Sequence, residues 1–117
     1  MYRMLIVCLM FVTTTGFAQA PEGVTRRSPL SSFSTHKTSD DFARCMSEAL
    51  RTDFPASRVD PGKAGKEILV SGDPSAAPVA VIDVADGVGG GAMVVIRTAS
   101  SMQPARDPTV KIARNCQ

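Results

Sequence analysis

The clearest pattern in the chain is an apolar stripe at helical spacing between residues 38 and 54. Its members recur at intervals of three and four residues, as one face of an α-helix requires. Thr38, followed three residues later by Asp41, is a helix-start signal, and Pro55 ends the pattern. The sequence therefore predicts a helix over residues 39–54. The stripe consists of Phe42, Cys45, Met46, Ala49 and Leu50.

Two runs rich in β-branched residues follow, at residues 79–86 and 92–99, with the loop Gly87–Gly91 between them. They predict a hairpin with a glycine-rich turn, and residues 67–71 predict a shorter strand before it. If Asp86 faces Ala92, the register divides the hairpin side chains between two faces. One face carries Ile82, Val84, Val94 and Ile96. The other carries Val79, Val81, Asp83, Met93, Val95 and Arg97, with Asp83 and Arg97 placed as diagonal neighbours able to pair.

A second helix is predicted at the end of the chain. Asp107 and Pro108 are suited to the N-cap and the first helical position, and an amphipathic turn or two leads to Cys116. The predicted fold class is therefore α+β. It has a three-stranded antiparallel meander, with an N-terminal and a short C-terminal helix packed on one face and joined by a disulfide.

Three segments are predicted along the chain. Residues 1–20 have the pattern of a secretory signal peptide, with Arg3 before an apolar run and Ala18-Gln19-Ala20 as the cleavage region. Cleavage after Ala18 or after Ala20 is open. An uncleaved anchor fits less well, because a spanning helix needs about 20 apolar residues. Residues 21–37 are predicted to be a flexible Ser/Thr/Pro-rich arm, and residues 38–117 a small α-β-β-β-α domain.

The cysteines indicate the compartment. Loss of the signal peptide removes Cys8 and leaves Cys45 and Cys116, which predicts a disulfide in an exported chain. Two free thiols or a metal pair are the alternatives, and only His36 is available to complete a metal site. We therefore expect a periplasmic or extracellular protein with no metal, no cofactor and no membrane span after processing.

Charge and motifs exclude several functions. Loss of Arg3 leaves 12 of the 13 Lys and Arg residues against 11 Asp and Glu, which gives no basic footprint for nucleic acid. Residues 87–92 formally match the dinucleotide-binding pattern GxGxxA, but that pattern must open a helix, and here a strand is expected. No Ser-His-Asp or Cys-His arrangement is supported, so we expect no enzyme.

The functional hypothesis rests on one face of the predicted sheet. Two helices on one face would leave the face with Val79, Val81, Met93 and Val95 uncovered. This face is either a protein-binding surface or an ordinary half-exposed β face.

The size of the chain, its predicted leader and its single predicted disulfide are similar in format to those of small periplasmic inhibitors and immunity proteins of bacteria. We therefore expect a non-enzymatic exported protein that binds another protein, through this face or the Gly87–Gly91 tip. The alternative is a structural or envelope-stress component that self-associates.

Overall fold

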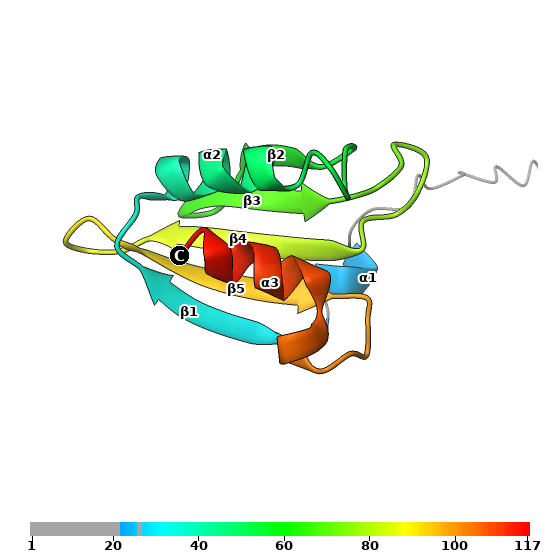
Figure 1. The fold of residues 1–117 in the computed structure, drawn as a ribbon. Helices are drawn as coiled ribbons and strands as arrows, with labels where there is room; N and C mark the ends of the chain where they lie inside the picture. The colour runs from blue at the N-terminus through cyan, green and yellow to red at the C-terminus, as the bar shows by residue number, and fades with distance from the viewer. Residues whose placement is uncertain (1–21, 26) are drawn as a thin grey trace, which may run out of the picture.

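The computed structural model describes residues 22–25 and 27–117, and the predicted signal peptide lies outside them. Two helices and a sheet make up the body of the molecule (Figure 1). The elements in chain order are α1 (Glu22–Thr25), β1 (Ser31–Thr35), α2 (Ser39–Ala49), β2 (Arg58–Pro61), β3 (Gly65–Val70), β4 (Ala80–Asp86), β5 (Ala92–Thr98), the 3₁₀ turn η1 (Pro104–Arg106) and α3 (Pro108–Asn115).

The sheet has five antiparallel strands in the order β1-β5-β4-β3-β2, so the predicted three-stranded meander is wrong. Strands β3, β4 and β5 form the predicted meander, and each of its edges gains one strand. β2 comes from a segment expected to be a loop, and β1 comes from the segment expected to be a flexible arm. Both are short, and each puts few apolar side chains into the core, so their sequences carried little strand signal.

The predicted hairpin register is confirmed. Asp86 faces Ala92, and the pairs continue through Val84–Val94 and Ile82–Ile96 to Ala80–Thr98. Because strand side chains alternate between faces, this register places the apolar row of both strands under the helices. That row is fully buried, and it forms the centre of the core with Ile68 and Val70 of β3.

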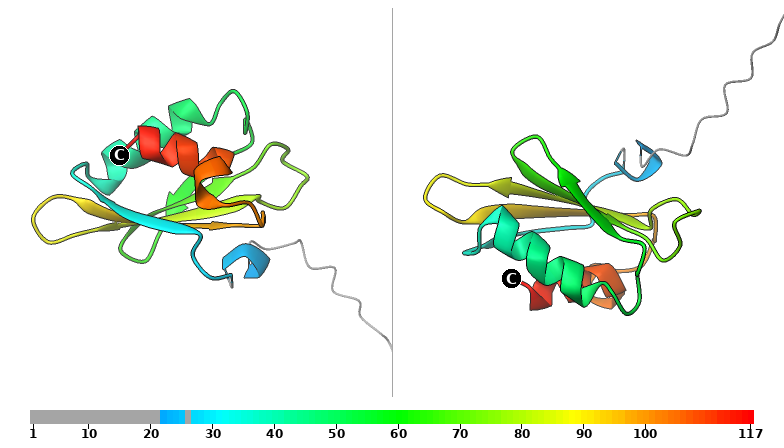
Figure 2. Two further views of the ribbon diagram at one scale, coloured as in Figure 1. Left: turned by 60° about the horizontal axis from the view of Figure 1, so that its bottom comes forward. Right: turned by 90° about the horizontal axis from the view of Figure 1, so that it is seen from above.

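The two longer helices cover one face of the sheet, and α1 lies on the other (Figure 2). α2 begins at the predicted cap, where the Thr38 hydroxyl accepts a hydrogen bond from the Asp41 N–H at 3.2 Å. It ends at Ala49 and not at residue 54 as predicted, and the chain continues in turns. α3 begins as predicted, because the buried Asp107 carboxylate accepts from the Thr109 and Val110 N–H groups at 2.9 and 3.3 Å.

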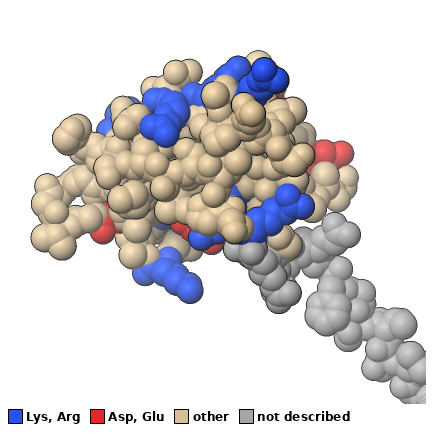
Figure 3. Space-filling view, turned by 90° about the horizontal axis from the view of Figure 1, so that it is seen from below, with Lys and Arg blue, Asp and Glu red and all other residues tan. Residues whose placement is uncertain are grey.

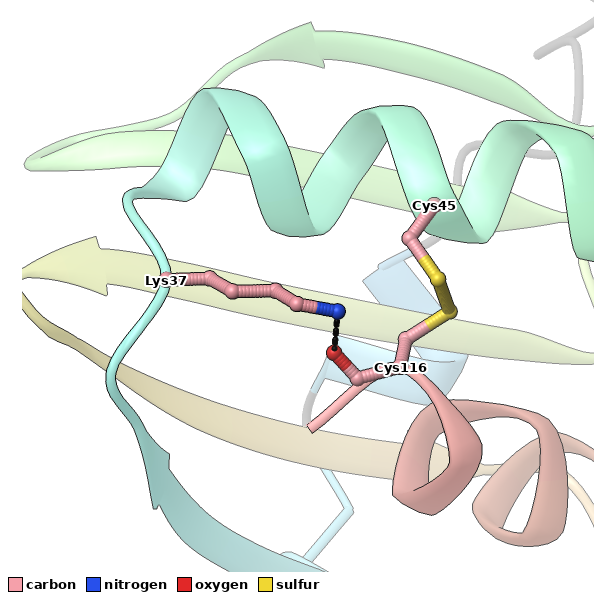
Figure 4. Close-up of a disulfide and its surroundings, with 3 residues drawn as sticks. All are labelled: Lys37, Cys45 and Cys116. Carbon is pink, nitrogen blue, oxygen red and sulfur yellow. Dashed lines mark hydrogen bonds between the residues drawn. A yellow bond between two sulfur atoms is a disulfide. The ribbon is translucent and has the colours of Figure 1, made fainter.

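A disulfide between Cys45 and Cys116 joins the two helices, as predicted, with the Cα atoms 5.8 Å apart (Figure 4). The side chain of Lys37 reaches the same point, and its ammonium group donates to the Cys116 carbonyl at 2.7 Å. A cation at the C-terminal end of a helix is favourable because the free carbonyls there carry partial negative charge. This hydrogen bond therefore holds the segment between β1 and α2 against the C-terminal end of α3.

Candidate functional site

The residues predicted for the binding face lie on the expected side of the sheet but do not form a continuous apolar patch. Val81 is completely buried, packed with Leu69 and with Val24 of α1. Val79 and Met93 are 41% and 46% exposed, but they lie at opposite ends of the hairpin. The segment with α1 therefore covers part of the face that was predicted to be open.

An ion pair occupies the middle of this face. As expected, Arg97 pairs with Asp83, and its Nη1 lies 2.9 Å from the carboxylate oxygen. The Nε of Arg97 also donates to the Arg27 carbonyl at 3.1 Å, and Arg27 in turn donates to the Ala99 carbonyl at 3.1 Å. These hydrogen bonds hold the chain after α1 against β5 and the residue that follows it, so the role of Arg97 here is structural.

A row of carboxylates crosses the same face. Asp60, Glu67 and Asp83 are directly paired neighbours on β2, β3 and β4. Partial burial raises the pKa of Glu67, and the charges of Asp83 and Asp60 raise it further, while Arg58 opposes the shift. The described residues contain no group of three or more His, Cys, Asp or Glu side chains placed to bind a metal ion. The raised pKa of Glu67 shows that partial burial and the two neighbouring carboxylates make ionised Glu67 unfavourable in the folded state.

Among the described residues, the hairpin tip carries the most exposed large apolar side chain. The loop Gly87–Gly91 projects beyond the sheet (Figure 1), and Val88 at its end is fully exposed, at 111% relative accessibility. Gly89 and Gly90 have φ values of +104° and +98°, a backbone region that favours glycine. The N–H of Gly87 bonds the Gly91 carbonyl at 2.8 Å and closes the loop. The glycines of this loop predicted a turn from the sequence, but no sequence signal singled out Val88.

The base of the tip is held in place by the rest of the fold. The Asp86 carboxylate accepts from the N–H of Ser39 at 2.9 Å and from its hydroxyl at 2.7 Å. These two bonds lower the pKa of Asp86 and join the hairpin to the first turn of α2. Gly91 lies so close to β1 that an added Cβ would be 2.6 Å from the Thr35 carbonyl oxygen. A glycine is therefore required where the tip leaves the sheet.

Two other sequence features have clear places in the structure. The GxGxxA match of residues 87–92 is followed by strand β5 and not by a helix, so the loop lacks the helix N-terminus that dinucleotide binding uses. His36 is exposed in the connection between β1 and α2. Among residues 22–25 and 27–117, no helix has the length and apolar character needed to cross a membrane.

Comparison with models of protein families, with characterised proteins and with solved structures finds no match to this chain.

Proposed function

We propose that this chain is an exported, non-enzymatic protein that binds another protein through the Gly87–Gly91 tip, in the manner of an inhibitor or immunity protein. Val88 is the residue that enters the partner's surface. The observation that carries the proposal is the position of Val88. It is a fully exposed apolar side chain at the end of a projecting loop whose base is fixed by the rest of the fold.

The fixed base matters because ordering a loop during binding costs free energy. An interface that is already in its bound shape avoids much of that cost. Here Asp86 is bonded to α2, Gly91 lies against β1, and the loop is closed by its own hydrogen bond. Single exposed apolar residues are common on proteins, so exposure alone would carry little weight. The fixed, projecting position is what distinguishes Val88.

The contribution of Val88 can be estimated from its size. Complete burial of a valine side chain stabilises a complex by about 2 kcal/mol, or roughly 30-fold in affinity. That is a useful anchor but not a whole interface, so backbone groups of the glycines must also contact the partner. Exposed glycine backbone suits this, because no side chain keeps the partner away.

Two further observations support export. The apolar run and cleavage region of residues 1–20 have the form of a signal peptide. The Cys45–Cys116 disulfide fits an oxidising compartment. The periplasm and the extracellular space both meet these conditions.

The proposal is tested by affinity capture from the envelope and culture fractions of the source cells. Three forms of residues 21–117 are compared: the native chain, Val88→Asp and Met102→Asp. Met102 is the matched control, because it is an exposed apolar residue at 53% on a connection elsewhere in the chain. We expect a partner captured by the native chain and by Met102→Asp but lost with Val88→Asp.

Equal capture by all three forms would show that the tip is not the binding element. Sedimentation of the same samples separates the alternative function. A stable homodimer of the native chain that dissociates in Val88→Asp would mean that the tip serves self-association.

A further inference from the structure

The two edges of the sheet are protected to very different degrees. The free edge of β2 carries Pro61 and the charged pair Arg58–Asp60, which are features that discourage further strand pairing. The free edge of β1 has the sequence SSFST, with neither a charge nor a proline. An unprotected edge strand offers unpaired N–H and C=O groups to another polypeptide.

The outward-facing backbone groups of β1 belong to Ser32 and Ser34. The Ser34 carbonyl accepts a hydrogen bond at 3.1 Å from the side chain of Gln117, so it points away from β5. Because backbone groups alternate in direction along a strand, those of Ser32 point the same way. Among the described residues, the exposed Gln117 amide is the one side chain that donates to the outward-facing backbone of this edge. An incoming strand would displace it.

A groove lies beside this edge on the helical side of the sheet. It has a volume of about 560 Å³, and its walls come from β1, η1 and α3. Pro104 and Ala105 supply exposed apolar surface, and Val110, which is 4% exposed, lies beneath them as part of the core. Lys111 and Arg114 supply positive charge. Figure 3 looks onto this edge and shows an uncharged middle, with Lys and Arg side chains on the helical side at the top.

The two cations of the groove lack acidic partners among the described residues. Lys111 is exposed and forms no ion pair there. The Arg114 guanidinium lies 4.6 Å from the centre of the Phe33 ring and donates to the Ser31 hydroxyl at 3.4 Å. These contacts hold Arg114 against β1 without neutralising it. A carboxylate entering the groove would therefore meet two positive charges.

The geometry points to a second binding site, distinct from the hairpin tip: the β1 edge and this groove take an extended segment of another polypeptide. The segment adds as a sixth strand next to β1. Its inward-facing side chains are an apolar residue, against Pro104 and Ala105, and a carboxylate, against Lys111 and Arg114. A second copy of this chain fits less well, because a β1 strand has no carboxylate to offer.

The probe is the peptide acetyl-TVTETVT-amide, titrated into ¹⁵N-labelled residues 21–117 and followed by NMR. Its Val and Glu side chains share one face when it is extended, and its threonines favour strand structure. We expect shifts in the amides of Ser32, Ser34 and Lys111, with a dissociation constant below about 1 mM. Acetyl-TVTKTVT-amide, which places a lysine opposite the cations, should bind more weakly.

Two modified peptides test strand addition itself. A strand uses only alternate N–H groups for one neighbour, so the peptide is N-methylated either at its even or at its odd positions. One form should lose binding, and the other should retain it. Equal binding by both forms would overturn the proposal, as would the absence of shifts at 1 mM peptide.

Variants of the protein supply the other half of the test. Lys111→Glu should weaken binding at least fivefold, about 1 kcal/mol. The control Lys63→Glu changes an exposed lysine in the β2–β3 turn and should leave binding unchanged. Gln117→Ala should strengthen binding, because it frees the Ser34 carbonyl.

Self-association is tested with the labelled protein alone. Amide shifts of Ser32 and Ser34 that depend on protein concentration in the absence of peptide would show that a second copy occupies the edge, and would contradict the proposal. None of these outcomes depends on Val88.

Discussion

Removal of the disulfide should cost the domain a large part of its stability. The bond joins residues 71 positions apart, and closing a loop of that length in the unfolded chain is worth about 4 kcal/mol. Small domains have total stabilities of roughly 5–15 kcal/mol. The double variant Cys45→Ala/Cys116→Ala should therefore be marginally folded. Alanine is chosen because Cys116 is buried, so a serine hydroxyl would add its own cost.

The assay is urea unfolding of residues 21–117 followed by circular dichroism. With a slope of about 1.3 kcal/mol per molar urea, a loss of 4 kcal/mol moves the midpoint down by roughly 3 M. The native chain with dithiothreitol should unfold near the midpoint of the double variant. A loss below about 1 kcal/mol would refute the reasoning, because the loop-closure term would then be absent. Two reactive thiols in the denatured, non-reduced native chain would refute the bond itself.

Three further predictions concern single side chains. Asp86→Asn should destabilise the domain at neutral pH. Because the folded-state pKa of Asp86 is lowered, its carboxylate stabilises the fold above about pH 4, and this contribution is lost on acidification. The unfolding curves of the variant and the native chain should therefore converge in acid. Glu67→Gln should stabilise the domain at pH 7, since the raised pKa makes the ionised carboxylate unfavourable in the folded state, and the gain should vanish as the pH falls through that pKa. Val24→Ala should cost about 1 kcal/mol in urea unfolding and expose the chain near α1 to proteases, whereas Val88→Ala should cost almost nothing.

The parts of the fold that were predictable from the sequence are those with strong local patterns. The stripe of α2, the Asp107-Pro108 start of α3 and the β-branched runs of β4 and β5 each carry their own signal. The turn Gly87–Gly91 then fixed the register of the hairpin. The disulfide was predicted from the two cysteines that remain if residues 1–20 are removed as a signal peptide.

The two edge strands were missed for a physical reason. β1 has a single large apolar residue, Phe33, among serines and threonine, and it pairs with β5 more than 55 residues later. β2 buries no residue completely and contains Pro61. Such strands form because a neighbouring strand is already in place, and local sequence does not show this. The same limit hid the contact of Val24 with Val81, and with it the covering of the expected binding face.

The candidate site was only half visible from the sequence. A run of glycines indicated a turn, but nothing in the sequence showed that the turn would project or that Ser39 and Thr35 would hold its base. The groove between β1 and α3 required the position of β1, which the sequence did not give.

The most direct test of the proposed binding role of the Gly87–Gly91 tip is site-specific photo-crosslinking in the source cells. A photoreactive amino acid is placed at position 88 in one sample and at the control position 102 in another. We predict a single adduct of defined mass at position 88 and none at position 102. Adducts at neither position, or the same adducts at both, would contradict the claim that Val88 is the point of contact with a partner.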